Sequence, residues 1–273
     1  MILQYRSNIH GDKKFSGIPI VFLHAFPMNL RMWEPQIEFL NNNHIKYVAI
    51  NYPGFGQSPL PENSKNSARM EFYAEKIRET LRKLRLSKAI FVGLSMGGYV
   101  AFALYRKWPE LFAGLVLANT RASADDETGR LRRIQMIDDL KKTEDPAPIF
   151  DQHMIKFFTS TTQRENQQLL KFTRQIMEAS TIPGIIFALE AMAGRAAAFD
   201  LLAGMNFPVL LLAGASDELT TVADARKMLS ILPRAKLEII EDAAHLSNLE
   251  KPEIFNQHLL RYWQQINIHF SLE

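Results

Sequence analysis

Short apolar runs recur along the chain and predict buried strands. Most of them are continuous rather than alternating in polarity, which is typical of strands covered on both faces. Each run is bounded by Gly, Pro, Asn or Asp, the residues that end regular structure. The predicted strands are residues 18–23, 46–50, 89–92, 114–118, 209–213 and 236–240.

Segments with helical spacing lie between these runs. Residues 68–86 place Phe72, Ile77 and Leu81 near one stripe, and residues 96–108 and 252–268 have comparable apolar faces. Strands that alternate with helices favour a parallel sheet with right-handed crossovers. The predicted fold class is therefore α/β, with a mostly parallel central sheet and helices on both faces.

The alternation stops between residues 121 and 205. Only helical patterns are found there, at residues 125–142, 150–158, 163–180 and 182–194, with interruptions at Pro146, Pro148 and Pro183. We interpret residues 121–205 as a helical lid inserted into a core made of residues 1–120 and 206–273. The alternative is an ordinary helical layer without a lid function.

Composition narrows the functional classes. The 273 residues include no cysteine, which excludes disulfides, thiolate nucleophiles and cysteine zinc sites. The charge balance of 32 Lys+Arg against 29 Asp+Glu gives a net charge of +3, too small to indicate a nucleic-acid partner. No signal peptide and no apolar run of about 18 residues is seen, so we expect a cytoplasmic protein without a membrane partner. The oligomeric state is left open.

One turn carries the strongest chemical signal. The apolar run at 89–92 leads into Gly93-Leu94-Ser95-Met96-Gly97 and directly on to a helix. A sharp strand-to-helix turn exposes a serine hydroxyl above the sheet edge, and the flanking glycines allow the close approach. The helix that follows directs its amino-terminal N–H groups at the same place. Ser95 is therefore the candidate nucleophile.

An acid and a histidine follow later strands in the order that such a serine requires. Asp217 comes after the run at 209–213, with Glu218 as a rival, and His245 comes after the run at 236–240. We prefer Asp217 because the shorter carboxylate suits a buried orienting role, although it could also be an acid at a helix N-terminus. His245 could instead be a loop histidine. Five other histidines, His153 among them, are expected at the surface, and no metal-ligand spacing such as His-Glu-x-x-His occurs.

Together these segments resemble the α/β-hydrolase superfamily over the whole chain. Residues 20–27 resemble its first strand and oxyanion loop, and residues 51–58 its glycine-rich turn. Residues 93–98 match the nucleophile turn, 214–217 the acid turn and 244–245 the histidine turn. Within the superfamily the chain is most similar to 3-oxoadipate enol-lactonases and related small carboxylesterases.

The resemblance implies a role for each matching residue. Ser95 would be the nucleophile, His245 the base and then the acid, and Asp217 the group that orients His245. The backbone N–H groups of Phe26 and Met96 would form the oxyanion hole. Some relatives place the acid one strand earlier, but Asn119 stands there in this chain and cannot act as a carboxylate.

The expected function is cofactor-independent hydrolysis of a small carboxylic ester or lactone, without a metal. Arg31, Arg121 or Arg195 could serve a substrate that carries a free carboxylate. The alternatives are a non-catalytic ligand-binding protein and a cofactor-free perhydrolase, in which peroxide replaces water. Apolar side chains available to line a substrate pocket, or simply to fill the core, are Phe26, Met28, Met96, Met154, Phe157, Met192 and Phe199.

Overall fold

The structure is a computed structural model that describes residues 2–10, 15–64 and 67–270. Its centre is a seven-stranded sheet in the order β1-β3-β2-β4-β5-β6-β7. Every neighbouring pair is parallel except β1 with β3, which confirms the predicted mostly parallel sheet. The strands are β1 (Tyr5–Ser7), β2 (Ser16–Leu23), β3 (Ile45–Ile50), β4 (Ala89–Leu94), β5 (Phe112–Ala118), β6 (Val209–Gly214) and β7 (Ala235–Ile240).

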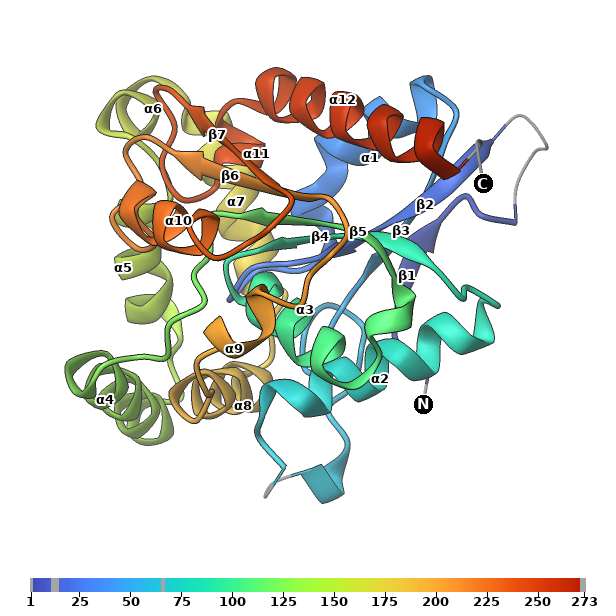
Figure 1. The fold of residues 1–273 in the computed structure, drawn as a ribbon. Helices are drawn as coiled ribbons and strands as arrows, with labels where there is room; N and C mark the ends of the chain where they lie inside the picture. Colours follow the sequence, from blue (N-terminus) through green and yellow to red (C-terminus); the bar gives the residue numbers. More distant parts are fainter. Residues whose placement is uncertain (1, 11–14, 65–66, 271–273) are drawn as a thin grey trace.

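Helices cover both faces of this sheet (Figure 1). The helices α1 (Glu34–Asn42) and α12 (Pro252–Phe270) lie on one face, and α2 (Met70–Lys83) and α3 (Met96–Lys107) lie on the other. The remaining helices outside the segment from β5 to β6 are α10 (Val222–Leu229), α11 (Ser247–Glu250) and the short 3-10 helices η1 (Leu30–Trp33), η2 (Glu62–Ser64) and η3 (Pro109–Leu111). β4 and β5 are buried along their whole length, as their continuous apolar runs predict.

Six helices and no strand lie between β5 and β6, a segment that the structure describes throughout. The larger ones gather at one end of the sheet (Figure 1). The predicted helix at 163–180 is wrong in one respect: it is two helices, because the Asn166 side chain accepts the backbone N–H of Leu169 and starts a new one. The six are α4 (Glu127–Thr143), α5 (Ala147–Phe157), α6 (Ser160–Glu165), α7 (Gln167–Glu178), α8 (Ile182–Ala193) and α9 (Phe199–Leu202).

Strand register brings the candidate residues to a single edge of the sheet. Leu23 pairs with Gly93, and Leu94 pairs with Ala118. Because these strands are parallel, the loops that leave their carboxyl ends all begin at that edge. The chain segments after β2, β4, β5, β6 and β7 therefore meet there.

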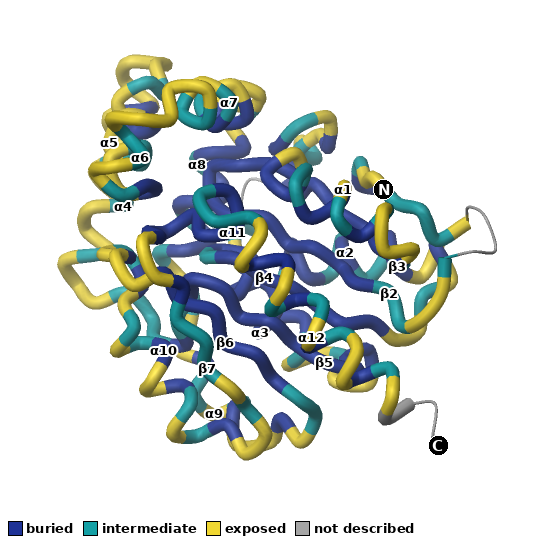
Figure 2. Tube along the Cα trace, turned by 90° about the horizontal axis from the view of Figure 1, so that it is seen from above, coloured by how far each residue is buried: buried dark blue, intermediate teal, exposed yellow. Residues whose placement is uncertain are grey.

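Burial follows the layers of the fold. The central strands form a dark, fully buried band, whereas the outer surfaces of the connecting helices are exposed (Figure 2). Within the described ranges, no single helix is long and apolar enough to cross a membrane. Among the described residues, only the helices α7 and α8 together have the required length and apolar composition, and they are bent by 92° relative to each other.

Candidate active site

Ser95 occupies a strained turn between β4 and α3. Its backbone has φ 54° and ψ −117°, outside the usual regions for a residue with a side chain, a conformation that costs about 1–3 kcal/mol. The turn is held because the Ser95 N–H donates to the Ala118 carbonyl at 3.0 Å and its carbonyl accepts the Thr120 Oγ1–H at 2.8 Å. Ser95 is the N-cap of α3, yet its side chain makes no capping hydrogen bond. The hydroxyl is thus left available, and Ser95 is half-buried while Leu94 and Met96 are buried.

The glycines around Ser95 are required by close backbone packing. A Cβ atom on Gly97 would lie 2.1 Å from the carbonyl oxygen of Leu23 on β2. A Cβ atom on Gly93 would lie 2.5 Å from the Gly97 carbonyl oxygen. Neither position accommodates a side chain, so the glycines let α3 begin directly against the sheet edge.

Asp217 and His245 are hydrogen-bonded to each other in the structure. The distance between Asp217 Oδ2 and His245 Nδ1 is 2.9 Å, and the two side chains are 0% and 2% exposed. An ionised carboxylate only accepts hydrogen bonds, so Nδ1 of His245 carries a proton, and in the neutral imidazole the lone pair is then on Nε2. The rival Glu218 is 77% exposed and lies 3.5 Å from Lys156. This geometry supports Asp217 over Glu218 as the partner of His245.

Four further hydrogen bonds keep Asp217 ionised. Its Oδ2 accepts Asn119 Nδ2–H at 2.9 Å and Thr220 Oγ1–H at 2.7 Å, and its Oδ1 accepts the backbone N–H groups of Leu219 and Thr220. Burial alone would raise the pKa of Asp217. The charge of His245 and the hydrogen bonds from His245, Asn119 and Thr220 outweigh it and lower the pKa to about 2.

Asn119, which the sequence indicates only as a position without the acid, holds the carboxylate of Asp217 in place. It lies directly after β5 with φ 44°. Besides binding Asp217, its Nδ2 donates to the Ala244 carbonyl at 3.2 Å, and its Oδ1 accepts the Ser247 Oγ–H at 2.5 Å. Asn119 therefore ties the acid to both sides of the histidine loop.

The loop after β2 is fixed by a buried histidine. His24 Nδ1–H donates to the Ala25 carbonyl at 2.9 Å, and its Nε2 accepts the Tyr52 N–H at 3.2 Å. Burial lowers the pKa of His24 to about 3, so the ring is neutral and serves as a structural spacer. Phe26 follows in this loop, and no hydrogen-bond partner of its N–H is found within the described part of the chain. Met96 is the first residue of α3, whose first N–H groups have no acceptor within the helix.

Helix α5 contacts both His245 and the loop after β2. Phe157 is fully buried, and its ring stacks on His245 with centroids 5.9 Å apart. One turn earlier, His153 lies edge-on to both Phe26 and Phe157, at 5.4 and 5.6 Å. The expectation that His153 is a surface residue is wrong: the ring is half-buried, its Nδ1–H donates to the Ile149 carbonyl, and burial lowers its pKa to about 4. The i, i+4 spacing of His153 and Phe157 was the available signal.

The structure places the other predicted pocket residues at different depths. Met28 is fully buried in the loop after β2, and Met154 is half-buried on α5. Met192 is buried on α8. Phe199 begins α9 beside Lys227, and the next residue, Asp200, pairs with Arg106. Arg106 lies ten residues after Met96, which is about 15 Å along α3. The contact of Asp200 with Arg106 therefore places the start of α9 near the far end of α3 and not beside Ser95.

Sequence comparison assigns the family. A profile described as the alpha/beta hydrolase fold matches residues 18–252, most of the chain. The chain belongs to this family. It is 28% identical over 239 residues to 3-oxoadipate enol-lactonase 2 of Acinetobacter baylyi, which covers 87% of this chain and 85% of that protein.

Solved structures agree with this assignment. An esterase from Thermogutta terrifontis, solved with malate bound, is 28% identical, with a TM-score of 0.89 and coverage of 97% and 94% of the two chains. The enol-lactonase from Burkholderia xenovorans shares the fold at 23% identity, with a TM-score of 0.85 and coverage of 96% of each chain. The relatives of this chain thus include a lactonase and an esterase, and this alpha/beta hydrolase is an enzyme of the hydrolase class.

None of the three arginines considered for substrate binding in this hydrolase is free of a partner. Arg31 pairs with Glu34 at 2.8 Å. Arg121 and Arg195, together with Arg133, surround the buried carboxylate of Asp125 at 2.8, 2.9 and 2.6 Å. Three positive charges thus face one negative charge in the segment between β5 and α4.

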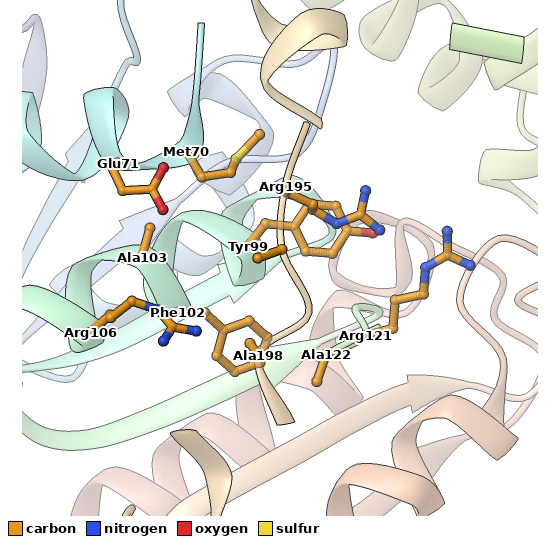
Figure 3. Close-up of a pocket in the computed structure, with 11 residues that line it drawn as sticks. Met70, Glu71, Tyr99, Phe102, Ala103, Arg106, Arg121, Ala122, Arg195 and Ala198 are labelled. Atoms are coloured by element: carbon orange, nitrogen blue, oxygen red, sulfur yellow. The ribbon is translucent and has the colours of Figure 1, made fainter. Parts of the chain in front are cut away.

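A small cavity lies next to this cluster (Figure 3). There Arg195 stacks over the ring of Tyr99, with its guanidinium carbon 4.1 Å from the ring centroid. The cavity has a volume of about 30 Å³, enough for one or two water molecules and too small for an ester. Neither Ser95 nor His245 lines it, so it is separate from the candidate catalytic site.

Proposed function

We propose that this protein is a serine hydrolase that cleaves small carboxylic esters or lactones through an acyl-enzyme, without a cofactor. The observation that carries the proposal is the buried hydrogen bond between Asp217 and His245, at the sheet edge where the strained turn exposes Ser95. Further support comes from the relatives, which include an enol-lactonase and an esterase.

In this mechanism His245 Nε2 removes the proton from Ser95 Oγ as the oxygen attacks the substrate carbonyl. The tetrahedral intermediate places its negative oxygen against the N–H groups of Phe26 and Met96. The C–O bond to the leaving alcohol then breaks, and His245 returns the proton to that oxygen. A water molecule, deprotonated by His245, attacks the acyl-enzyme, and the acid leaves as Ser95 regains its proton.

Asp217 has a defined part in each proton transfer. Since its pKa is lowered to about 2, it stays ionised and keeps the proton of neutral His245 on Nδ1. The same negative charge stabilises the imidazolium that forms when Nε2 takes the Ser95 proton. Burial of the pair strengthens this interaction because little water screens it.

For the substrate pocket we propose apolar side chains of α5 and of the loop after β2. Phe157 covers His245, and Phe26 belongs to the proposed oxyanion loop. Met154 lies on the same helix as Phe157, and Met28 follows Phe26 by two residues. Such a lining favours a short neutral acyl group over a dicarboxylate.

The test is acylation by a chromogenic short-chain ester, p-nitrophenyl acetate. The wild-type protein should release a burst of one nitrophenolate per protein molecule, since acylation precedes the slower hydrolysis of the acyl-enzyme. The Ser95→Ala variant should show no burst, whereas the Ser230→Ala control, at an exposed serine ending α10, should behave as wild type. Retention of the burst in Ser95→Ala would refute the proposal.

A further inference from the structure

The lid and the histidine loop of this hydrolase are joined through the side chain of Glu250. Glu250 is the last residue of α11, five positions after His245. Its Oε2 accepts the backbone N–H of Ala244, the residue before His245, at 2.6 Å. Its Oε1 accepts both the backbone N–H and the Oγ1–H of Thr159, at 2.8 and 2.7 Å. Thr159 lies in the lid, between α5 and α6.

A second link lies on the other side of His245. The backbone N–H of Leu246 donates to the Phe157 carbonyl at 3.0 Å, and the Phe157 ring stacks on the imidazole. The two residues that flank His245 are thus both fastened to lid residues 157–159, one directly and one through Glu250. Movement of this part of the lid must move the histidine loop with it.

The carboxylate of Glu250 is committed to this junction. It makes no ion pair within the described residues, so no lysine or arginine competes for its oxygens. Hydrogen bonds to a charged acceptor are stronger than those between neutral groups, so three such bonds form a firm junction. The Ala244 carbonyl also accepts a hydrogen bond from Asn119 Nδ2–H, and Asn119 in turn donates to Asp217.

We propose that Glu250 is a positioning residue for catalysis: it fastens the His245 loop to the lid and so holds the imidazole in the place that proton transfer from Ser95 requires. This inference rests on the proposed serine mechanism. Glu250 does not touch the reacting atoms; it acts through the backbone of Ala244. A displacement of about 1 Å in catalytic geometry costs on the order of 100-fold in rate, so losing the junction should reduce kcat strongly.

The experiment compares Glu250→Ala and Glu250→Gln with a Glu253→Ala control at an exposed site on α12. Two quantities are measured: amide hydrogen exchange at Thr159 and Ala244 without substrate, and the acylation rate per folded protein with p-nitrophenyl acetate. For Glu250→Ala we expect faster exchange at both amides and a roughly 10- to 100-fold slower acylation, with KM little changed. The near-isosteric Glu250→Gln keeps one acceptor oxygen, so it should fold normally and fall between wild type and Glu250→Ala.

Acylation by either Glu250 variant at the wild-type rate would overturn the proposal, whatever the exchange data show. In Glu250→Ala, faster exchange at only one of the two amides would also overturn it, since the junction would not couple the two segments. Failure of the proposed function looks different: the wild-type protein itself would show no burst. The exchange measurement does not depend on activity and would still report on the junction.

Discussion

Replacing Asp217 with asparagine is the most selective test of the candidate triad, because the change keeps the shape of the side chain and removes its charge and one acceptor oxygen. The carboxylate accepts five hydrogen bonds, from His245, Asn119 and Thr220 on one side and from the backbone N–H groups of Leu219 and Thr220 on the other. An amide has one acceptor oxygen and one NH2 group. Whichever way it turns, its NH2 group must face donors.

Both orientations of the new amide have a predictable effect. If its NH2 group faces His245, the imidazole must accept at Nδ1 and carry its proton on Nε2, where it can no longer deprotonate Ser95. If its NH2 group faces Leu219 and Thr220, their buried N–H groups lose their acceptor, at about 1–3 kcal/mol each. The first orientation is expected, because the imidazole can change its tautomer, whereas the two backbone N–H groups can only donate. A wrong tautomer in such a triad costs on the order of 10⁴-fold in kcat, so Asp217→Asn should acylate about 10⁴ times more slowly.

The same substitution should change how stability depends on pH. The pKa of Asp217 is lowered from 3.8 to about 2, which corresponds to roughly 2–3 kcal/mol in favour of the folded state. Because the folded pKa is the lower one, this stabilisation is present above pH 4 and is lost as the pH falls towards 2. Urea unfolding should therefore find Asp217→Asn destabilised at pH 7, with the difference shrinking towards pH 2.

The matched control for this experiment is Glu218→Gln, which removes the neighbouring exposed carboxylate. It should leave both acylation and stability within about twofold and 0.5 kcal/mol of wild type. The reasoning is refuted if Asp217→Asn retains a tenth or more of the wild-type acylation rate, or if Glu218→Gln loses as much activity as Asp217→Asn.

Three further predictions concern the surroundings of the site. Gly97→Ala should lower the free energy of unfolding in urea by at least about 2 kcal/mol, because its Cβ atom would lie 2.1 Å from a β2 carbonyl oxygen. Gly194→Ala is the control and should be tolerated, because the nearest atom to its Cβ would be 3.6 Å away. Asn119→Ala should slow acylation about tenfold or more, since it removes a donor to Asp217, and an unchanged rate would exclude a role for Asn119. The pKa of His24 is lowered from 6.5 to about 3, so only the unfolded state takes up this proton as the pH falls below 6.5. Between pH 7 and 5 the free energy of unfolding should therefore fall less in His24→Gln than in wild type, by up to about 2 kcal/mol. Equal losses in the two proteins would contradict this.

The central strands of the sheet could be predicted because they are buried on both faces. A strand of this kind is a continuous apolar run, as β4 and β5 are, so its existence is clear in the sequence. Its bounds are less clear: β4 continues two residues beyond the predicted 89–92, and β5 begins two residues before the predicted 114–118. β1 was missed since it has only three residues, Tyr5–Ser7, which are exposed or half-buried at the edge of the sheet. The break at Asn166 was missed because a single side-chain cap, rather than the apolar pattern, divides α6 from α7.

The candidate site could be predicted only in part, for a related reason. Ser95, Asp217 and His245 each follow a predicted strand, so chain order and sheet topology bring them to one edge. The residues that hold them belong to segments without such an anchor. The Thr159–Glu250 contact spans 91 positions, from the loop between α5 and α6 to the short helix α11, and no pattern in the sequence indicates that pairing.

The central claim is that Ser95 is the nucleophile activated by His245. A fluorophosphonate probe, followed by digestion and mass spectrometry of the labelled peptide, tests it most directly. The account predicts about one phosphonyl group per protein molecule, on Ser95, formed rapidly by the wild-type protein and at least about 1000-fold more slowly by His245→Ala. Absence of labelling, labelling at another residue, or equal rates in the two proteins would contradict it.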